Sequence, residues 1–260
     1  MYSSDTHPRY FDLKVLAIIF IMLLTIFFAT SAQAQEESKK HKYISIGISG
    51  LTGTSLGDFF YESNQITTWG INGTLLYHPK KPDKLLIGFG ISYFNYGLEK
   101  YRREIQIEGN YYEVETLRNY NIYFPYINTR LMPWDNLRFV PVFDAFLGPR
   151  AFSTVSTYSI DEETGFLIRL FGKGSDGEIV KHTEHKDWTW GYGFSVGVNY
   201  YASNFIEFEL TLSYTDGGEV HYLTKSDIIR DPVSGSFSYK TRKSDTDMLV
   251  LGIGMRLNPL

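Results

Sequence analysis

The sequence has no cysteine among its 260 residues, which excludes a disulfide scaffold and a thiolate-ligated metal site. It also has no strong excess of either charge, because 25 basic and 29 acidic residues give a formal net charge of −4 at pH 7. We therefore expect no nucleic-acid partner. After residue 30, no run of apolar residues approaches the roughly 18 that indicate a transmembrane helix. Any role in a membrane must then depend on strands.

Aromatic residues are abundant, with 20 Tyr and 19 Phe, and together with Trp they make up 17% of the chain. Hydrophobic content of 43% and a mean hydropathy of −0.19 are typical of a soluble protein, but a membrane barrel with a polar lumen has the same average. The aromatic content favours the barrel, since outer-membrane barrels carry belts of aromatic side chains at both membrane interfaces.

The first 34 residues have the features of a secretory signal peptide. Arg9 and Lys14 precede an apolar run at 15–30, and Ala32-Gln33-Ala34 supplies the small residues that signal peptidase requires. We expect cleavage after residue 34, which separates the signal peptide at 1–34 from a short leader at 35–42 and a barrel domain at 43–260. The alternative is an uncleaved membrane anchor, but the run is shorter than the roughly 20 residues of a spanning helix.

One segment, WTWGYGFSVGVNYY at 188–201, alternates between large apolar residues and small or polar ones. This period of two places Trp188 and Trp190 on one face of a strand, and Gly193 and Ser195 on the other. An ordinary strand has about 5 to 6 residues, whereas a strand that crosses a bilayer needs about 9 to 11. The segment therefore predicts a transmembrane strand whose aromatic face contacts lipid.

The same alternation recurs along the mature chain. The expected strands lie at 44–49, 69–78, 85–94, 120–131, 139–147, 188–201, 206–214 and 249–257. The connections alternate in length, short at 78–84, 132–136 and 202–204 and long at 52–65, 95–118, 152–186 and 215–245. Outer-membrane barrels have this layout of short periplasmic turns and long extracellular loops. The sequence predicts an all-β fold, an eight-stranded antiparallel up-and-down transmembrane β-barrel.

Two local irregularities are expected in the fourth strand and the loop before it. Pro125 interrupts the hydrogen-bond ladder of the fourth strand, so we expect a β-bulge there. The segment REIQIEGNYYEVETL carries a hairpin signal at Gly109-Asn110. Strands three and four are therefore expected to project beyond the membrane.

Several charged residues fall on the inward face of the predicted strands. Glu207 and Glu209 begin the seventh strand and Arg256 ends the eighth, so antiparallel pairing brings them to the same depth. We expect a salt-bridge network that neutralises these carboxylates inside a narrow barrel, and we expect Asp144 and Arg150 to extend it toward the long loops. The alternative interpretation is a gate or a narrow ion path.

Other residues are expected to serve the membrane and the packing of the lumen. The predicted membrane-interface aromatics, whose amphipathic rings suit the headgroup level, are Trp69, Tyr77, Trp188, Trp190, Tyr200 and Tyr214. Inward-facing glycines are expected to make room for Phe94, Tyr123 and Tyr201. Two basic clusters, Lys80, Lys81 and Lys84 on a short turn and Lys100, Arg102 and Arg103 on a long loop, are expected to aid solubility, and the second could contact lipopolysaccharide phosphates.

No motif for catalysis or cofactor binding is present. His182 and His185 with Glu184 have a superficial likeness to a metal cluster, but they lie in a connection predicted to be irregular. Ser213 and His221 have no G-x-S-x-G elbow to support a catalytic role. We therefore expect no enzymatic activity, no cofactor and no metal.

The mature chain resembles the small outer-membrane β-barrel family, the PorT-like and OmpX/OmpA-like eight-stranded proteins. The stretches that carry the resemblance are AQA at the end of the signal segment, YNIYFPYINTRLMP with its central Phe124-Pro125, FLGPRA, WGYGFSVGVNYY and the terminal LGIGMRL. They cover nearly all of 43–257. Such barrels usually end in an aromatic residue, whereas this chain ends Leu257-Asn258-Pro259-Leu260.

The resemblance implies a non-enzymatic protein of the cell outer membrane. The implied partners are outer-membrane lipid and lipopolysaccharide, the barrel-assembly machinery during insertion, and other envelope or secretion proteins. A PorT-like protein would be a secretion accessory, and an OmpX-like one would act in adhesion or envelope integrity. Two alternatives stay open, a narrow channel or small-solute transporter and an exported lipocalin-like binding barrel with its apolar faces inward.

Overall fold

The computed structural model describes residues 44–63, 66–79, 84–107, 110–134, 137–160, 180–203, 205–230 and 237–258. The expected signal peptide at 1–34 and leader at 35–42 lie outside these residues. Among the residues that the structure describes, no helix is both long and apolar enough to cross a bilayer.

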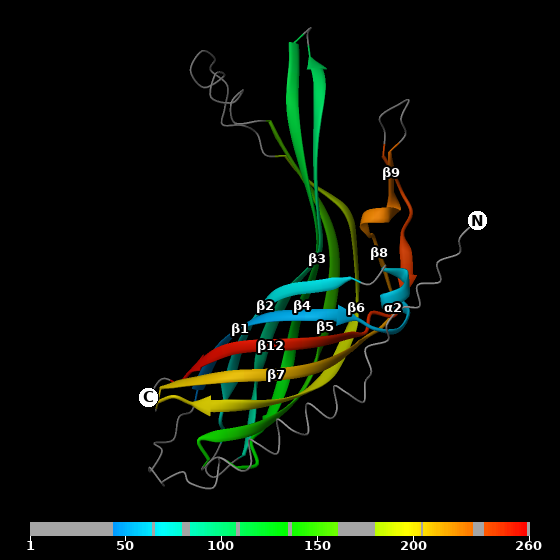
Figure 1. Cartoon of the computed structure of the whole chain (residues 1–260). Coiled ribbons are helices and arrows are strands. Elements are labelled where there is room, and N and C mark those ends of the chain that lie inside the picture. Colours follow the sequence, from blue (N-terminus) through cyan, green and yellow to red (C-terminus); the bar gives the residue numbers. More distant parts are fainter. Residues whose placement is uncertain are drawn as a thin grey trace, which may run out of the picture.

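Eight antiparallel strands form a closed barrel (Figure 1). They are β1 (Ile44–Ser55), β2 (Thr67–Tyr77), β3 (Leu85–Ile107), β4 (Asn110–Leu131), β5 (Phe139–Ile160), β6 (Val180–Tyr201), β7 (Ile206–Gly217) and β12 (Met248–Leu257). The pairing of β1 with β12 closes the ring, from Ile46 opposite Leu257 to Ser55 opposite Met248. The prediction of an eight-stranded antiparallel barrel is confirmed.

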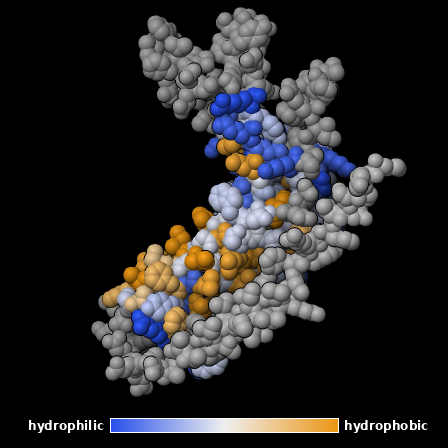
Figure 2. All heavy atoms as spheres, viewed as in Figure 1, coloured by the Kyte–Doolittle hydropathy of each residue, from blue (hydrophilic) through white to orange (hydrophobic). Residues whose placement is uncertain are grey.

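The outer surface of the barrel is apolar. In β1, Ile44, Ile46 and Ile48 are exposed, while Ser45 and Ser49, which alternate with them, are buried inside the barrel. The other seven strands repeat this alternation, and Figure 2 shows hydrophobic residues over the barrel wall with hydrophilic residues gathered beyond it. Because a soluble protein buries such faces, this is the surface of a membrane-spanning barrel. A lipocalin-like binder requires the opposite orientation.

Four of the strands are much longer than the membrane requires. β3 has 23 residues and β4, β5 and β6 have 22 each, whereas the other four have 10 to 12. At roughly 3.3 Å per residue, 22 residues exceed an apolar band about 25 Å tall. Residues 97–107, 110–120, 151–160 and 180–190 therefore continue past the barrel as a four-stranded sheet, which we call the protruding sheet (Figure 1).

Short elements cover the same end of the barrel. They are α2 (Gly57–Glu62), β8 (Val220–Tyr222), η2 (Lys225–Asp227), β9 (Ile228–Arg230), β10 (Phe237–Tyr239) and β11 (Arg242–Ser244). β8 pairs with β11 and β9 with β10. We call α2, β8, η2 and β11 together the cap. These elements were not predicted from the sequence, because strands of three residues and helices of three to six residues are too short to show a period.

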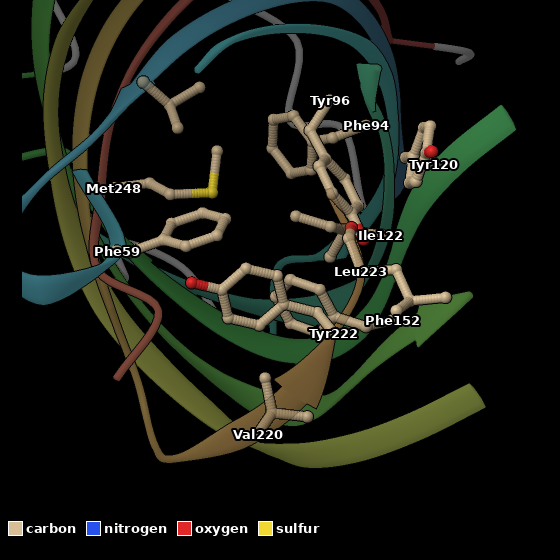
Figure 3. Close-up of a cluster of buried hydrophobic side chains, with 11 residues drawn as sticks. Phe59, Phe94, Tyr96, Tyr120, Ile122, Phe152, Val220, Tyr222, Leu223 and Met248 are labelled. Carbon is tan, nitrogen blue, oxygen red and sulfur yellow. Dashed lines mark hydrogen bonds between the residues drawn. The ribbon is translucent and has the colours of Figure 1, made fainter. Parts of the chain in front are cut away.

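Two apolar clusters fill the two ends of the barrel interior. The loop-end cluster joins the cap to the wall and consists of Phe59, Phe94, Tyr96, Tyr120, Ile122, Phe152, Val220, Tyr222, Leu223, Met248 and Val250. Figure 3 shows its side chains pointing into the ring of strands. The turn-end cluster consists of Leu76, Leu86, Met132, Val140 and Val142. The barrel is therefore packed with apolar side chains at both ends.

The predicted bulge at Pro125 is wrong. The β4–β5 register is the same on either side of Pro125, and Pro125 itself stands opposite Ile91 of β3. A proline removes one donor from the ladder without adding a residue, so the register is preserved. One register shift lies between Asn95 and Gly97, where the extra residue Tyr96 is buried in the loop-end cluster, and a second lies opposite Thr154 and Val155, where Glu184 is the extra residue of β6.

The predicted hairpin between β3 and β4 forms, with Ile107 opposite Asn110. Gly109 of the predicted turn lies outside the described residues. The hairpin belongs to the protruding sheet, as expected from its length.

Candidate functional site

Arg130 is the centre of a charge network inside the barrel. Its Nε donates to Asp144 Oδ1 at 2.6 Å and its Nη2 to Asp144 Oδ2 at 2.9 Å. Its Nη1 donates to Glu209, which also accepts a hydrogen bond from Arg256 Nη2 at 2.8 Å. Two arginines thus neutralise two carboxylates, and all four side chains are buried. Such an arrangement satisfies charges that would be costly to bury alone.

The register of the strands brings these residues together. Arg130 of β4 stands opposite Asp144 of β5, and Glu209 of β7 stands opposite Gly254 of β12, two residues from Arg256. The lumen positions of Asp144, Glu209 and Arg256 were predicted from the sequence, whereas that of Arg130 was not. Both faces of the fourth strand carry apolar side chains. Which of them faces the lumen could therefore not be predicted, and Arg130 was not assigned to the lumen.

Two of the expected network members have other partners. Glu207 stands opposite Arg256 in the backbone register, yet its carboxylate accepts hydrogen bonds from the amides of Asn199, at 2.9 Å, and Asn258. Arg150 lies farther along β5 than Asp144 and does not join the network. It donates instead to the Thr246 carbonyl oxygen at 2.5 Å. The prediction that Arg150 extends the salt bridges is wrong, because Arg150 lies six positions along β5 from Asp144.

Arg150 anchors the cap instead. It is fully buried, and its Nη2 donates to Thr215 Oγ1 at 3.2 Å. The rings of Phe124 and Phe152 lie 5.7 and 5.9 Å from its guanidinium carbon. One side chain of β5 therefore connects β7 and the segment before β12, where the chain returns from the cap to the barrel.

A small polar chamber lies between the two apolar clusters. Its volume is about 60 Å³, and Asn72, Ser92, Asn128 and Ser195 contribute to its wall together with Arg130, Asp144 and Glu209. A cavity needs about 10 to 15 Å³ for each water, so the chamber suits a few water molecules and no organic solute. In the part of the chain that the structure describes, Asn128 Oδ1 is buried without a hydrogen-bond partner, a position that a water would complete.

Glycines on the inner face make room for aromatic rings, although not for all the expected ones. A Cβ atom at Gly90 would lie 2.2 Å from the Tyr126 ring, and one at Gly193 would lie 2.7 Å from the Phe146 ring. Phe94 is buried inside as predicted. Tyr123 is 42% exposed on the outer face, so its expected place in the lumen is wrong.

The six predicted interface aromatics lie at the two ends of the outer wall. Trp69, Trp188, Trp190 and Tyr214 are toward the long loops, and Tyr77 and Tyr200 are toward the short turns, with Trp69, Tyr77, Trp188 and Trp190 all more than half exposed. Tyr214 donates to Asp247 at 3.1 Å, and Tyr200 accepts from Arg138 at 2.6 Å. Trp134, Tyr192 and Phe205 have similar exposure and were not predicted.

The protruding sheet has two strand edges without a pairing partner among the described residues. β2 pairs with β3 only as far as Asn95, so residues 97–107 of β3 pair with β4 alone. β7 pairs with β6 only from Gly191 onward, so residues 180–190 of β6 have β5 as their strand neighbour. Edges of this kind present backbone donors and acceptors to another chain.

The outer face of the protruding sheet carries a charged cluster. Lys100 Nζ and Arg102 Nε lie 2.7 and 3.2 Å from the Glu115 carboxylate. The hydrogen bond from Lys100 is the main reason that the pKa of Glu115 falls below its usual value. Lys100 and Arg102 thus have an internal partner, and the side chain of Arg103 lies outside the described residues.

The cap and the protruding sheet are joined at an Asp–His contact. Asp187 Oδ2 accepts a hydrogen bond from the His221 backbone amide at 2.8 Å and lies 3.1 Å from His221 Nδ1. His185 Nε2 lies 2.9 Å from the His221 carbonyl oxygen. Among the described residues no group of three or more His, Cys, Asp or Glu could hold a metal ion. Ser213 lines the chamber inside the barrel, so the structure does not bring it to His221.

No family model matches the chain, and no curated protein matches it in sequence. Among solved structures it is similar to Neisserial surface protein A, with 10% identity over 83% of this chain and 97% of that one and a TM-score of 0.39. It is also similar to the attachment invasion locus protein Ail of Yersinia pestis, with 11% identity over 84% of this chain and 99% of that one and a TM-score of 0.37. A third similar structure is the outer membrane protease OmpT of Escherichia coli, with 11% identity over 87% of this chain and 100% of that one and a TM-score of 0.32. At such low sequence identity, these similarities concern the fold alone.

Proposed function

We propose that the protein is an integral outer-membrane barrel that acts without catalysis and uses its protruding sheet to bind a protein partner outside the cell. The observation that carries the proposal is a four-stranded sheet that continues past the apolar band with both edges unpaired by described strands. In outer-membrane barrels the short turns face the periplasm and the long loops face the exterior, so the protruding sheet would face the exterior.

The sheet edges suit recognition by strand addition. An extended segment of a partner can complete the backbone hydrogen bonds of residues 97–107, and the side chains beside the edge then select the partner. The 180–190 edge is less open, because the Trp190 carbonyl oxygen already accepts a hydrogen bond from the Gly218 amide at 3.1 Å. Lys100 and Lys186 are exposed near these edges. Charged residues, lysine above all, oppose pairing between copies of one chain. A different chain is therefore the expected occupant.

The interior supports action at the surface rather than transport. Apolar clusters occupy both ends of the lumen, and the chamber between them holds only water-sized molecules. Eight strands leave an interior that side chains nearly fill. A secretion accessory, an adhesin and an envelope-integrity protein could each use such a sheet, and the location of the partner distinguishes these roles.

Membrane residence is tested by fractionation. The mature protein should stay with outer membranes after carbonate washing and should migrate faster unheated than boiled on a detergent gel. Release by carbonate, or identical migration before and after heating, would contradict a membrane barrel.

Partner binding is tested with a matched pair of edge variants. Successive residues of a strand direct their backbone amides to opposite sides, so Lys100→Pro and Tyr101→Pro remove one amide from the free edge and one from the β4 ladder. Both variants should remain heat-modifiable. The variant that lacks an amide on the free edge should no longer bind proteins that the wild type captures from intact cells or envelope extracts. Equal retention by wild type and both variants would contradict recognition through this edge.

A further inference from the structure

The unpaired edge of β3 carries an apolar side chain and two cations in a row. β2 pairs with β3 only as far as Asn95, where the β3–β4 hairpin begins to rise beyond the barrel (Figure 1). Leu98 is 51% exposed, and the side chains of Lys100 and Arg102 are 52% and 60% exposed. Alternate residues of a strand point to the same face, so these three side chains share one face of the protruding sheet. We call Leu98, Lys100 and Arg102 the edge row.

On the other face of the sheet, the polar groups of the same segment have partners within the protein. Glu99 accepts hydrogen bonds from the Tyr120 hydroxyl at 2.7 Å and from Arg118 Nη1 at 3.4 Å, and both donors belong to fully buried residues. The Arg118 guanidinium carbon lies 5.6 Å from the centroid of the Tyr101 ring. The side chains that select an added strand are therefore those of the edge row.

β4 shows which side chains the edge row accepts on its paired side. Arg102 stands opposite Glu115, and Lys100 stands opposite Leu117. The Glu115 carboxylate lies 3.2 Å from Arg102 Nε and 2.7 Å from Lys100 Nζ, so one acidic residue of β4 contacts both cations. A residue in the middle of a sheet has such a cross-strand neighbour on each side, whereas among the described strands the edge row has one on the β4 side alone.

The charges of the edge row favour an acidic neighbour on its open side. Lys100 and Arg102 share the single carboxylate of Glu115, which lies on the β4 side and is only 26% exposed. Opposite charges that face one another across two strands stabilise the pairing, and like charges destabilise it. Leu98 lies outside the apolar band, so an apolar neighbour would remove its side chain from water.

We propose that this edge binds an acidic extended segment of another protein, which pairs antiparallel with residues 98–102. The segment carries Asp or Glu opposite Arg102 and Lys100 and an apolar residue opposite Leu98. This inference deepens the proposed function and rests on it. Antiparallel pairing is slightly more stable per residue than parallel pairing and continues the alternation of the barrel strands. A second copy that paired edge row to edge row would bring these cations opposite one another.

The test is an NMR titration of the folded, isotope-labelled mature protein in zwitterionic detergent micelles with short synthetic peptides. The acidic peptide has the core Glu-Val-Glu-Thr-Val, whose glutamates face Arg102 and Lys100 and whose last valine faces Leu98. In the neutral peptide, Gln replaces both glutamates. The acidic peptide should shift the backbone amides of residues 98–102. It should bind about tenfold more tightly than the neutral one, because each of the two charge pairs contributes about threefold.

Charge reversal distinguishes the edge row from a general attraction to acidic peptides. Lys100→Glu should weaken binding of the acidic peptide about tenfold and should favour a peptide with Lys at the position that faces residue 100. Lys243→Glu on β11 of the cap is the matched control. The Lys243 side chain is 50% exposed and lies 2.6 Å from Glu219, much as Lys100 lies beside Glu115. This variant should bind the acidic peptide as the wild type does.

Equal affinity of the acidic and neutral peptides, or an equal effect of Lys100→Glu and Lys243→Glu, would overturn the proposal. If the amides of residues 98–102 still shifted, recognition through the sheet edge would stand without its charge selectivity. No shift with any peptide would count against the edge itself, and so against the proposed function.

Two other occupants of the edge give different results, and each would overturn the proposal. Displacement of the acidic peptide by lipopolysaccharide at the same concentration would assign the two cations to its phosphates. Sedimentation of the wild type as a dimer that Lys100→Pro or Tyr101→Pro dissociates would identify a second copy of this chain. Heat-modifiable migration of each variant shows that the barrel is folded.

Discussion

Arg130 is the residue on which the charge balance of the lumen depends. It bonds both Asp144 and Glu209, and its removal leaves Asp144 without a cation among the described residues. Breaking a buried ion pair by deleting one partner typically costs about 3 to 5 kcal/mol, because the remaining charge stays buried. Arg130 therefore contributes more to stability than any exposed ion pair of this barrel.

We predict that Arg130→Met lowers the free energy of unfolding by about 3 to 5 kcal/mol. The measurement is urea unfolding in lipid vesicles, followed by tryptophan fluorescence. Arg102→Met is the matched control, because Arg102 is 60% exposed and solvent screens its pair with Glu115. Equal losses in the two variants would show that the lumen network is not a stabilising unit.

Asp187 gives the contact between cap and protruding sheet a dependence on pH. Burial raises the pKa of its carboxyl, but hydrogen bonds from the backbone amides of His221 and Trp188 and from the His221 side chain outweigh burial, so the pKa lies below the ordinary 3.8. A carboxyl whose pKa is lower in the folded state stabilises the fold above its unfolded pKa. That contribution is lost as the pH falls below 3.8 and through the folded value.

We therefore predict that the amide of His221 exchanges faster with solvent as the pH falls from about 4 toward 2, after correction for intrinsic exchange rates. Hydrogen exchange with mass spectrometry measures this change. In Asp187→Asn, the corrected rate should be independent of pH over the same range. An equally strong pH dependence in Asp187→Asn would assign it to another group.

At the scale of elements, α2 is a helix held by packing rather than by its own sequence. It has six residues, its N-cap is Leu56 without a side-chain hydrogen bond, and isolated helices of this length are not stable in water. Phe59 supplies the packing, since its ring is fully buried and lies 5.2 Å from Tyr222 and 6.1 Å from Phe152. The cap thus depends on one aromatic side chain of α2.

We predict that Phe59→Ala weakens the docking of the cap by about 3 to 5 kcal/mol and leaves the barrel strands in place. Amides of β8 should exchange faster with solvent, whereas amides in β7 and β12 below the cap should not. Tyr61→Ala is the control on the same helix, because Tyr61 is 73% exposed. Faster exchange throughout the barrel would contradict this prediction, because Phe59 would then stabilise the whole fold and not the cap alone.

At the scale of the whole molecule, the two apolar clusters narrow the barrel interior at both ends. Loop-end and turn-end side chains pack inside the ring of strands, and the Arg130 network crosses the lumen between them. The chamber of about 60 Å³ that is left holds only a few water molecules. We therefore expect the residues that bind a partner to lie on the outer surface of the molecule.

We predict that the protein forms no ion-conducting pore. In planar bilayers, neither the wild-type protein nor Arg256→Ala should produce discrete conductance steps, because Arg256 is buried in a lumen that side chains fill at both ends. An open eight- or ten-stranded pore protein in the same bilayers is the positive control. Conductance steps in the wild type that change in Arg256→Ala would favour the narrow channel over the proposed function.

Outside the fourth strand, the sequence alone determined which residues face the lipid, and it determined how many strands close the barrel. A strand alternates with a period of two, so the faces of Ile44, Trp69 and Trp188 follow from their immediate neighbours. The alternation of long and short connections likewise follows from sequence spacing. For the same reason, the inward positions of Glu209 and Arg256 could be predicted.

Only the tertiary structure decided which inward groups meet. The partner of a lumen charge depends on the register of strands far apart in sequence and on the closure of the ring, and neither leaves a local pattern. Arg130 therefore escaped prediction, Arg150 proved to anchor the cap, and the bulge lay at Tyr96 instead of Pro125. The cap escaped for a related reason: its short segments take their structure from burying Phe59 and Tyr222 in the barrel mouth, not from a periodicity of their own.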